Sequence, residues 1–183
     1  MRKFSSIVVF SVVVCVQGRA ADEFDTIQCG ADIPKAMAGK RSSNERVVVI
    51  EARHGNLGLK DLGGQEISDR LFLVSWRICG GEYAVLVNTQ EHLVRDVLPV
   101  PAHSLRSPLS SVEECQVAGK ETPDAVIAIL DNSQGQMPKG HFGKMMLPVK
   151  LAWKIDERQE RFLPMLTQCL SCAVSGSNAD VRE

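Results

Sequence analysis

The stretch RLFLVSWRICGGEYAVLVN, residues 70–88, decides the fold, because it predicts a β-hairpin with one apolar face. Two apolar runs flank Gly80-Gly81. A Gly-Gly connection suits the primed two-residue turns, since both positions can adopt positive φ. The pairs across the hairpin are then Cys79 with Glu82, Ile78 with Tyr83, Trp76 with Val85, and Val74 with Val87.

One face of this hairpin is uniformly large and apolar, whereas the opposite face is mixed. Aromatic and β-branched residues that pair across strands are typical of a protein core. A slip of one strand by one residue would scatter the apolar set over both faces. We therefore predict a core made of Phe72, Val74, Trp76, Ile78, Tyr83, Val85 and Val87.

The segments before the hairpin predict a short helix, a strand and a long loop. Asp32 is a suitable N-cap, Pro34 fits the first turn, and Gly39 fits the position after the last helical residue. Residues 46–54, RVVVIEARH, are rich in β-branched residues and predict a largely buried strand. The glycine-rich and charged segment 55–70 predicts a loop, and loops of this length are often functional.

The segments after the hairpin predict further antiparallel strands. A third strand is expected at His92–Leu98, and the proline- and serine-rich segment 99–114 predicts a surface loop. An unbroken apolar run predicts a buried strand at 124–132. A second hairpin is expected around the turn 156–159, with Trp153 facing Phe162 and Ile155 facing Glu160.

These elements predict a mainly β protein, an antiparallel sandwich or partly open barrel with a short N-terminal helix. The alternative is an α+β arrangement, in which the helix packs on a single sheet. We expect a signal peptide at 1–20, a single β-rich domain at 21–166, and a flexible C-terminal tail with a CxxC motif at 167–183.

The N-terminus predicts export. Arg2 and Lys3 precede the apolar run 7–16, and the small residues Gly18 and Ala20 suit cleavage before Ala21. The apolar run is shorter than the roughly 20 residues that a membrane span needs. We therefore expect a periplasmic or extracellular protein with no transmembrane segment in the mature chain.

The mature chain is weakly acidic. Removal of three basic residues with the signal peptide leaves 18 basic against 22 acidic residues, a net charge of −4. Because no basic block is present, nucleic acid is not an expected partner. The expected partner is a protein, a glycan or a small molecule.

Five cysteines remain in the mature chain, and in an oxidising compartment most of them should pair. An odd number leaves one thiol over or requires one intermolecular bond. Spacing does not fix the connectivity, although Cys169 and Cys172 are close enough to pair with each other. We expect at least one disulfide among the first three of the set Cys29, Cys79, Cys115, Cys169 and Cys172.

Two histidines at predicted strand ends are the candidate site for metal-assisted hydrolysis or acid–base chemistry. If those strand ends meet, His54 and His103 would converge with Glu66 or Asp69 from the long loop. The spacing of the histidines matches no diagnostic metal motif, and solvated or hydrogen-bonded loop histidines are the alternative.

Other chemical motifs are weaker. Cys169-Leu170-Ser171-Cys172 resembles a redox dithiol in spacing, but it lacks the strand–helix context that lowers a thiolate pKa. The mature chain holds no GxSxG or SxxK motif and no phosphate- or dinucleotide-binding loop, so we expect no cofactor. The sequence therefore favours a non-enzymatic binding or structural module, with a metal-assisted hydrolase or a thiol-redox protein as alternatives.

Overall fold

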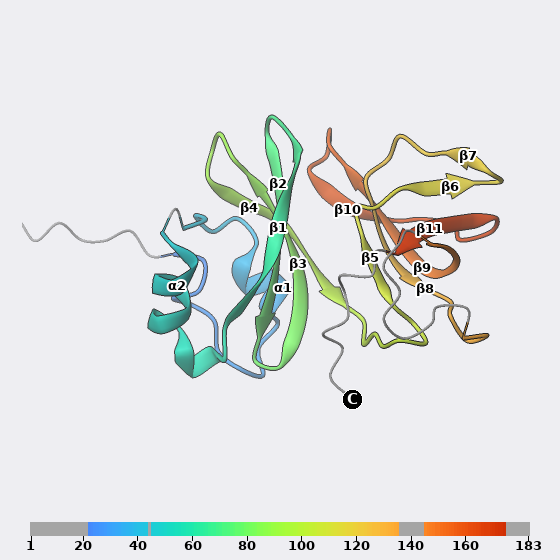
Figure 1. The fold of residues 1–183 in the computed structure, drawn as a ribbon. Coiled ribbons are helices and arrows are strands. Elements are labelled where there is room, and N and C mark those ends of the chain that lie inside the picture. The colour runs from blue at the N-terminus through green and yellow to red at the C-terminus, as the bar shows by residue number, and fades with distance from the viewer. Residues whose placement is uncertain (1–21, 44, 136–144, 175–183) are drawn as a thin grey trace, which may run out of the picture.

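The computed structural model describes residues 22–43, 45–135 and 145–174. The protein is mainly β, with two antiparallel sheets and short helices near the N-terminus, as in a β-sandwich. The helices are α1 (Ile33–Met37) and α2 (Val47–Arg53), followed by the 3₁₀ turn η1 (Gly55–Leu57). Figure 1 shows α2 and the second sheet on opposite sides of the first sheet.

The first sheet is a four-stranded meander in the order β1-β2-β3-β4. Its strands are β1 (Lys60–Ser68), β2 (Leu71–Ile78), β3 (Gly81–Asn88) and β4 (Leu93–Val100). The expected third strand at His92–Leu98 is confirmed as β4.

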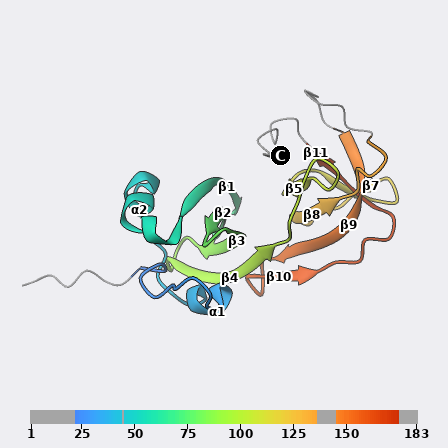
Figure 2. The same ribbon diagram turned by 90° about the horizontal axis from the view of Figure 1, so that it is seen from below.

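The second sheet has the order β5-β8-β9-β11-β6-β7, and β10 also pairs with β9. The long strand β9 bends and pairs with β8, β10 and β11. Seen from below in Figure 2, β4 runs toward β10, and the two strands are in contact. The strands are β5 (Leu109–Ser111), β6 (Cys115–Val117), β7 (Lys120–Glu121), β8 (Val126–Leu130), β9 (Met145–Asp156), β10 (Arg161–Pro164) and β11 (Leu170–Val174).

The predicted hairpin exists, but its pairing differs from the prediction. The turn residues are Cys79 and Gly80, with φ of +53° and +80°, and Gly81 begins β3. Trp76 therefore pairs with Tyr83 instead of Val85. Relative to the predicted pairing, the register of each strand is shifted by one residue. Because the two shifts add to an even number, the same side chains still share a face. Trp76 is buried, as predicted. Cys79 tolerates its left-handed conformation because its N–H donates to the Leu57 carbonyl and its sulfur is bonded to Cys29.

The predicted strand at 46–54 is wrong, because residues 47–53 form the helix α2. A buried strand would hide its valines, yet Val47, Val48 and Val49 are 43%, 66% and 43% exposed, and only Ile50 of α2 is buried. β1 and β3 occupy the two edges of β2, so residues 47–53 do not pair with this strand. Its tertiary position therefore overrides its β propensity.

The predicted loop at 55–70 is also wrong, since nine of its residues form β1. Its glycines serve a bulged strand rather than a loop. Gly63 has φ of +106° at a β-bulge, and a Cβ on Gly64 would lie 2.6 Å from the Leu73 carbonyl oxygen. The predicted loop at 99–114 likewise contains the short strand β5.

The helix prediction is confirmed at both ends of α1. The Asp32 carboxylate accepts the Lys35 N–H at 3.1 Å, Pro34 lies in the first turn, and Gly39 follows the C-cap with φ of +74°. The strand expected at 124–132 is confirmed as β8, at Val126–Leu130.

The second hairpin exists with a different register. Its four-residue turn spans 157–160, so Phe162 pairs with Ile155 rather than with Trp153. The shift puts Phe162 and Ile155 together in the core between the sheets. The tail prediction also needs correction, because residues 170–174 form the buried strand β11. A disulfide and two strand partners hold this strand, whereas residues 175–183 lie outside the described part.

Both faces of the first sheet are covered. On the Trp76 face, a cluster with α1 and the N-terminal segment buries Phe24, Ile33 and Met37. On the opposite face, Leu73 and Leu86 pack against the second sheet. The mixed face of the hairpin is therefore an interface between the sheets. A third cluster lies within the second sheet, around Cys115, Leu147 and Cys172.

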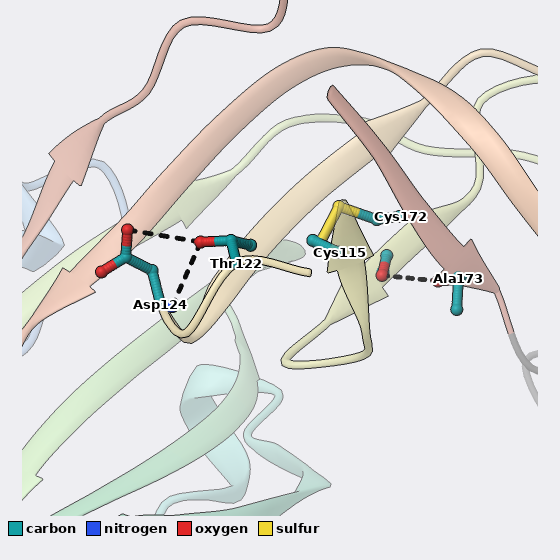
Figure 3. The surroundings of a disulfide bond; sticks show 6 residues. Cys115, Thr122, Asp124, Cys172 and Ala173 are labelled. Atoms are coloured by element: carbon teal, nitrogen blue, oxygen red, sulfur yellow. Dashed lines mark hydrogen bonds between the residues drawn. A yellow bond between two sulfur atoms is a disulfide. The ribbon is translucent and has the colours of Figure 1, made fainter. Parts of the chain in front are cut away.

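Two disulfides link the residues that the structure describes. Cys29–Cys79 ties the N-terminal segment to the β2–β3 turn, which confirms a disulfide among the first three mature cysteines. Cys115–Cys172 joins directly opposed residues of β6 and β11, beside the Thr122–Asp124 turn (Figure 3). A pairing of Cys172 with Cys169 is thereby excluded in this structure. Within the described residues, no helix is long and apolar enough to cross a membrane.

Candidate functional site

The polar cluster richest in chemistry begins at Asp22, where the first described residues form a tight turn. Asp22 Oδ1 accepts the N–H groups of Phe24 at 2.9 Å and of Asp25 at 3.0 Å. In return, Asp25 Oδ2 accepts the Asp22 N–H at 2.9 Å. These bonds form an Asx-type turn that holds the two carboxylates close together.

His54 meets this turn from the C-terminal end of α2, where it is the C-cap residue. Its Nε2 lies 3.1 Å from Asp22 Oδ2. Its ring packs against Phe24 with centroids 5.2 Å apart, and Phe24 packs on Trp76 at 4.6 Å. The imidazole is therefore buried between the core aromatic residues and a carboxylate.

The charges of this cluster are closely paired. Arg53 Nη1 contacts Asp22 Oδ2 at 3.2 Å, and the same guanidinium pairs with Glu45. Burial raises the pKa of Asp22, but hydrogen bonds with His54 and with the N–H groups of Phe24 and Asp25 outweigh it and leave the pKa below its ordinary value.

Glu23 is fully buried beside this cluster. Its carboxylate accepts the Ser43 N–H with both oxygens, at 3.0 and 2.9 Å, and lies 3.4 Å from Ser42 Oγ. Burial is the main cause that raises the pKa of Glu23 to about 6. This side chain ties the N-terminal turn to the segment that leads into α2.

The ligand atoms of Asp22, Asp25 and His54 are close enough together to hold a metal ion. One carboxylate oxygen from each aspartate and one ring nitrogen of His54 all lie within 4.8 Å of one another. Among the residues that the structure describes, these three form the group of histidine, cysteine, aspartate or glutamate side chains whose ligand atoms are close enough to share a metal ion. It contains His54 but neither His103 nor the predicted carboxylates.

The other predicted site residues have different surroundings. Glu66 pairs with Phe72 late in β1, and Asp69 lies exposed in the β1–β2 turn, whereas His54 precedes the start of β1. Nine strand residues span roughly 25–30 Å. The strand β1 therefore carries both carboxylates away from His54, and a shared site remains a prediction.

His103 has its own partners after β4. Its Nε2 lies 3.9 Å from Glu82 Oε2, which is also 3.7 Å from Arg77. Its Nδ1 lies 3.4 Å from the Pro101 carbonyl oxygen. These contacts fit the hydrogen-bonded loop histidine that the sequence left as the alternative.

The CxxC motif does not form a dithiol in this structure. Cys172 is fully buried and bonded to Cys115, which leaves Cys169 as an exposed free thiol. Cys169 precedes the strand β11 and has a left-handed φ of +59°. A redox dithiol needs two thiols that open and close together, and here one of them is part of the core.

Asp22 and Asp25 were missed by sequence analysis. Two aspartates three residues apart are a signal for an Asx turn, but not for a partner about thirty positions away. The connection to His54 depends on α2, which the sequence presents as a strand. Neither a family model nor a curated protein nor a solved structure matches this chain.

Proposed function

We propose that this protein is an exported, non-catalytic binding module that docks on another protein. The predicted signal peptide and the two disulfides support export to an oxidising compartment. The observation that carries the proposal is the exposure of three consecutive valines on α2. We call Val47, Val48 and Val49, together with Leu62 of β1, the strand that contacts α2, the valine surface.

The valine surface has no evident role in folding. Val48 is 66% exposed, and Leu62 is 40% exposed in β1, the strand that contacts α2. The Glu51 carboxylate accepts the Asp61 N–H at 2.9 Å and fixes the helix against this strand. Val48 therefore gains little from burial, and valine is a poor helix former. Several exposed aliphatic side chains on one short helix and the strand that it contacts are typical of a protein interaction site.

A protein partner fits this surface better than a glycan does. Sugar rings are commonly bound by stacking on exposed aromatic side chains. The large exposed apolar residues of the described chain are all aliphatic, and Trp76 is buried. Aliphatic side chains bind by excluding water from a complementary apolar surface, which another protein can present.

A non-catalytic role is favoured because three of the groups suited to chemistry, Asp22, His54 and Cys172, are buried and bonded within the fold. Asp22 and His54 are buried and bonded to each other, and Cys172 is held in a disulfide. A nucleophile or general base needs access to a substrate. These side chains connect the N-terminal segment to α2, and β11 to β6.

Site-specific photo-crosslinking in cells that naturally produce the protein tests this proposal. A photoreactive phenylalanine in place of Val48 should give one discrete adduct with another protein. Excess wild-type protein should suppress that adduct, and excess Val48→Asp protein should not. The matched control carries the probe at Leu151, which is 46% exposed on the second sheet. The same adducts from both positions, or none from Val48, would refute the proposal.

A further inference from the structure

We propose that Asp22, Asp25 and His54 form a binding site for a divalent transition-metal ion, for which Zn²⁺ is the probe. The proposal goes beyond docking through the valine surface and is independent of it. Its basis is the convergence of one ligand atom from each residue within 4.8 Å. Two of the residues come from one turn, and the third comes from the end of α2.

The donor set suits a transition metal. Imidazole nitrogen favours Zn²⁺ and other divalent ions of the first transition series, and carboxylate oxygens complete such sites. With bonds of about 2.0–2.2 Å, adjacent ligand atoms of a tetrahedral zinc site lie about 3.3–3.6 Å apart. His54 Nε2 and Asp22 Oδ2 are 3.1 Å apart, which is close to this spacing, and one ligand atom from each of the three residues lies within 4.8 Å of the others.

The inner and outer sides of the cluster differ. Asp22 and His54 are buried, whereas Asp25 is exposed. Phe24 packs against the imidazole and restricts its orientation. A buried pair supplies preorganised ligands, and the exposed aspartate leaves a path for the ion to enter from solvent.

Arg53 is the competitor for this site. Its guanidinium lies 3.2 Å from Asp22 Oδ2, so this oxygen already binds a cationic group. The same guanidinium pairs with Glu45, which can retain it when the metal takes Asp22. Loss of the Arg53 charge should therefore strengthen metal binding, an effect that a purely structural cluster would not show.

Titration of the metal-free, untagged protein with ZnCl₂ by calorimetry tests the proposal. We expect one saturable site that Asp25→Asn weakens at least about tenfold, since even outer-shell changes cost this much. Because Asp25 is exposed, this variant should fold even if His54→Gln does not. Arg53→Gln should bind more tightly, and the controls Asp69→Asn and His103→Gln should bind as the wild type does.

Co²⁺ gives a second readout through its visible absorption, which reports coordination geometry. We expect an intense visible band in the wild type that Asp25→Asn weakens. Wild-type protein with no saturable Zn²⁺ binding would overturn the proposal. Equal binding by wild type and Asp25→Asn, or weaker binding by Arg53→Gln, would overturn it as well.

Discussion

The two faces of the first sheet are both covered around β2 and β3, but by different kinds of cover. On the Trp76 face the cover is an irregular N-terminal segment with short helices. It is fastened by the Cys29–Cys79 disulfide and by the ion pairs of Asp22. On the Leu73 face the cover is the second sheet, whose β9–β10 hairpin inserts Phe162 between the layers.

The second cover is fastened by polar contacts at its turn. Asn88 Nδ2 donates to Glu160 Oε1 at 2.8 Å, and the other Glu160 oxygen pairs with Arg95. The Phe162 N–H donates to Asp96 Oδ2 at 2.8 Å. A sheet satisfies its own backbone, so a few side chains suffice to attach it. The irregular segment bonds to β4 where the Gly39 N–H donates to the Val94 carbonyl oxygen, and the Cys29–Cys79 disulfide adds a covalent link.

Loss of the central aromatic on the Trp76 face should have the largest effect. Trp76→Ala should lower the free energy of unfolding by about 3–5 kcal/mol, the range for deleting a large buried aromatic. Urea denaturation monitored by circular dichroism measures it. An unchanged unfolding midpoint would show that Trp76 is not a core residue.

Removal of each disulfide should affect the two covers differently. Cys29→Ala/Cys79→Ala and Cys115→Ala/Cys172→Ala open loops of similar sequence separation, 50 and 57 residues. Chain entropy therefore predicts a similar loss from each, about 4 kcal/mol. The location of the loosened structure should differ, because only the first bond holds the N-terminal cover.

Hydrogen exchange measured by mass spectrometry checks this difference. Without Cys29–Cys79, amides in 22–43 should exchange faster, while those of β8 and β9 keep their relative protection. In Cys115→Ala/Cys172→Ala, the amides of residues 22–43 should keep the protection that they have in the wild type, once the change in global stability is taken into account. An equal increase in the exchange rate of residues 22–43 in both variants would contradict a specific role of Cys29–Cys79 in holding the N-terminal cover.

The contact at the second cover should have a moderate effect. Glu160→Ala leaves the amide of Asn88, which is 3% exposed, without its acceptor, at a cost of about 1–3 kcal/mol. The matched control is Glu157→Ala in the same turn, since Glu157 is exposed and uses its carbonyl oxygen to bind Arg70. Thermal unfolding should show a clear loss for the first variant and little for the second.

Sequence reasoning identified the face of the hairpin but not its exact pairs. Alternation fixes which side chains share a face, and that property survives a one-residue shift of each strand. The register was set by Cys79, whose left-handed turn position is supported by Leu57 and Cys29. Neither contact is visible in the local sequence. α1 was predictable because its capping signals are local.

The candidate site was beyond sequence reasoning for the same reason. His54 was identified as a candidate, but its partners depend on whether 47–53 is a helix and 60–68 a strand. Local propensity favoured the opposite assignment for both segments. In the structure β1 pairs with β2, and His54 lies at the end of the helix α2, 3.1 Å from Asp22. Neither long-range contact can be deduced from local propensity.

Glu23 should give the N-terminal cover a pH dependence. Its pKa is raised from 4.5 to about 6, so its ionisation opposes folding. Its contribution to stability is fully present below about pH 4.5 and is lost as the pH rises through 6. The shift corresponds to about 2 kcal/mol at most. Urea unfolding of metal-free protein at about pH 4.5 and 7 should show that Glu23→Gln removes this part of the pH dependence. An identical pH dependence in both proteins would contradict the assignment.

The smallest expected effect lies in α2, where the sequence and the structure disagree most directly. Val48 is the most exposed of the three valines, so its replacement removes little buried surface. Alanine is the best helix former and valine one of the weaker ones, so Val48→Ala should stabilise the protein by about 0.5 kcal/mol. In a strand the same change would destabilise, because β-branched residues favour strands.

The urea midpoints of the wild type and of Val48→Ala show whether the variant gains or loses stability. The control is Leu62→Ala in the adjacent strand β1, which should not gain stability. A loss of stability in Val48→Ala would contradict the gain that helix propensity predicts at this position.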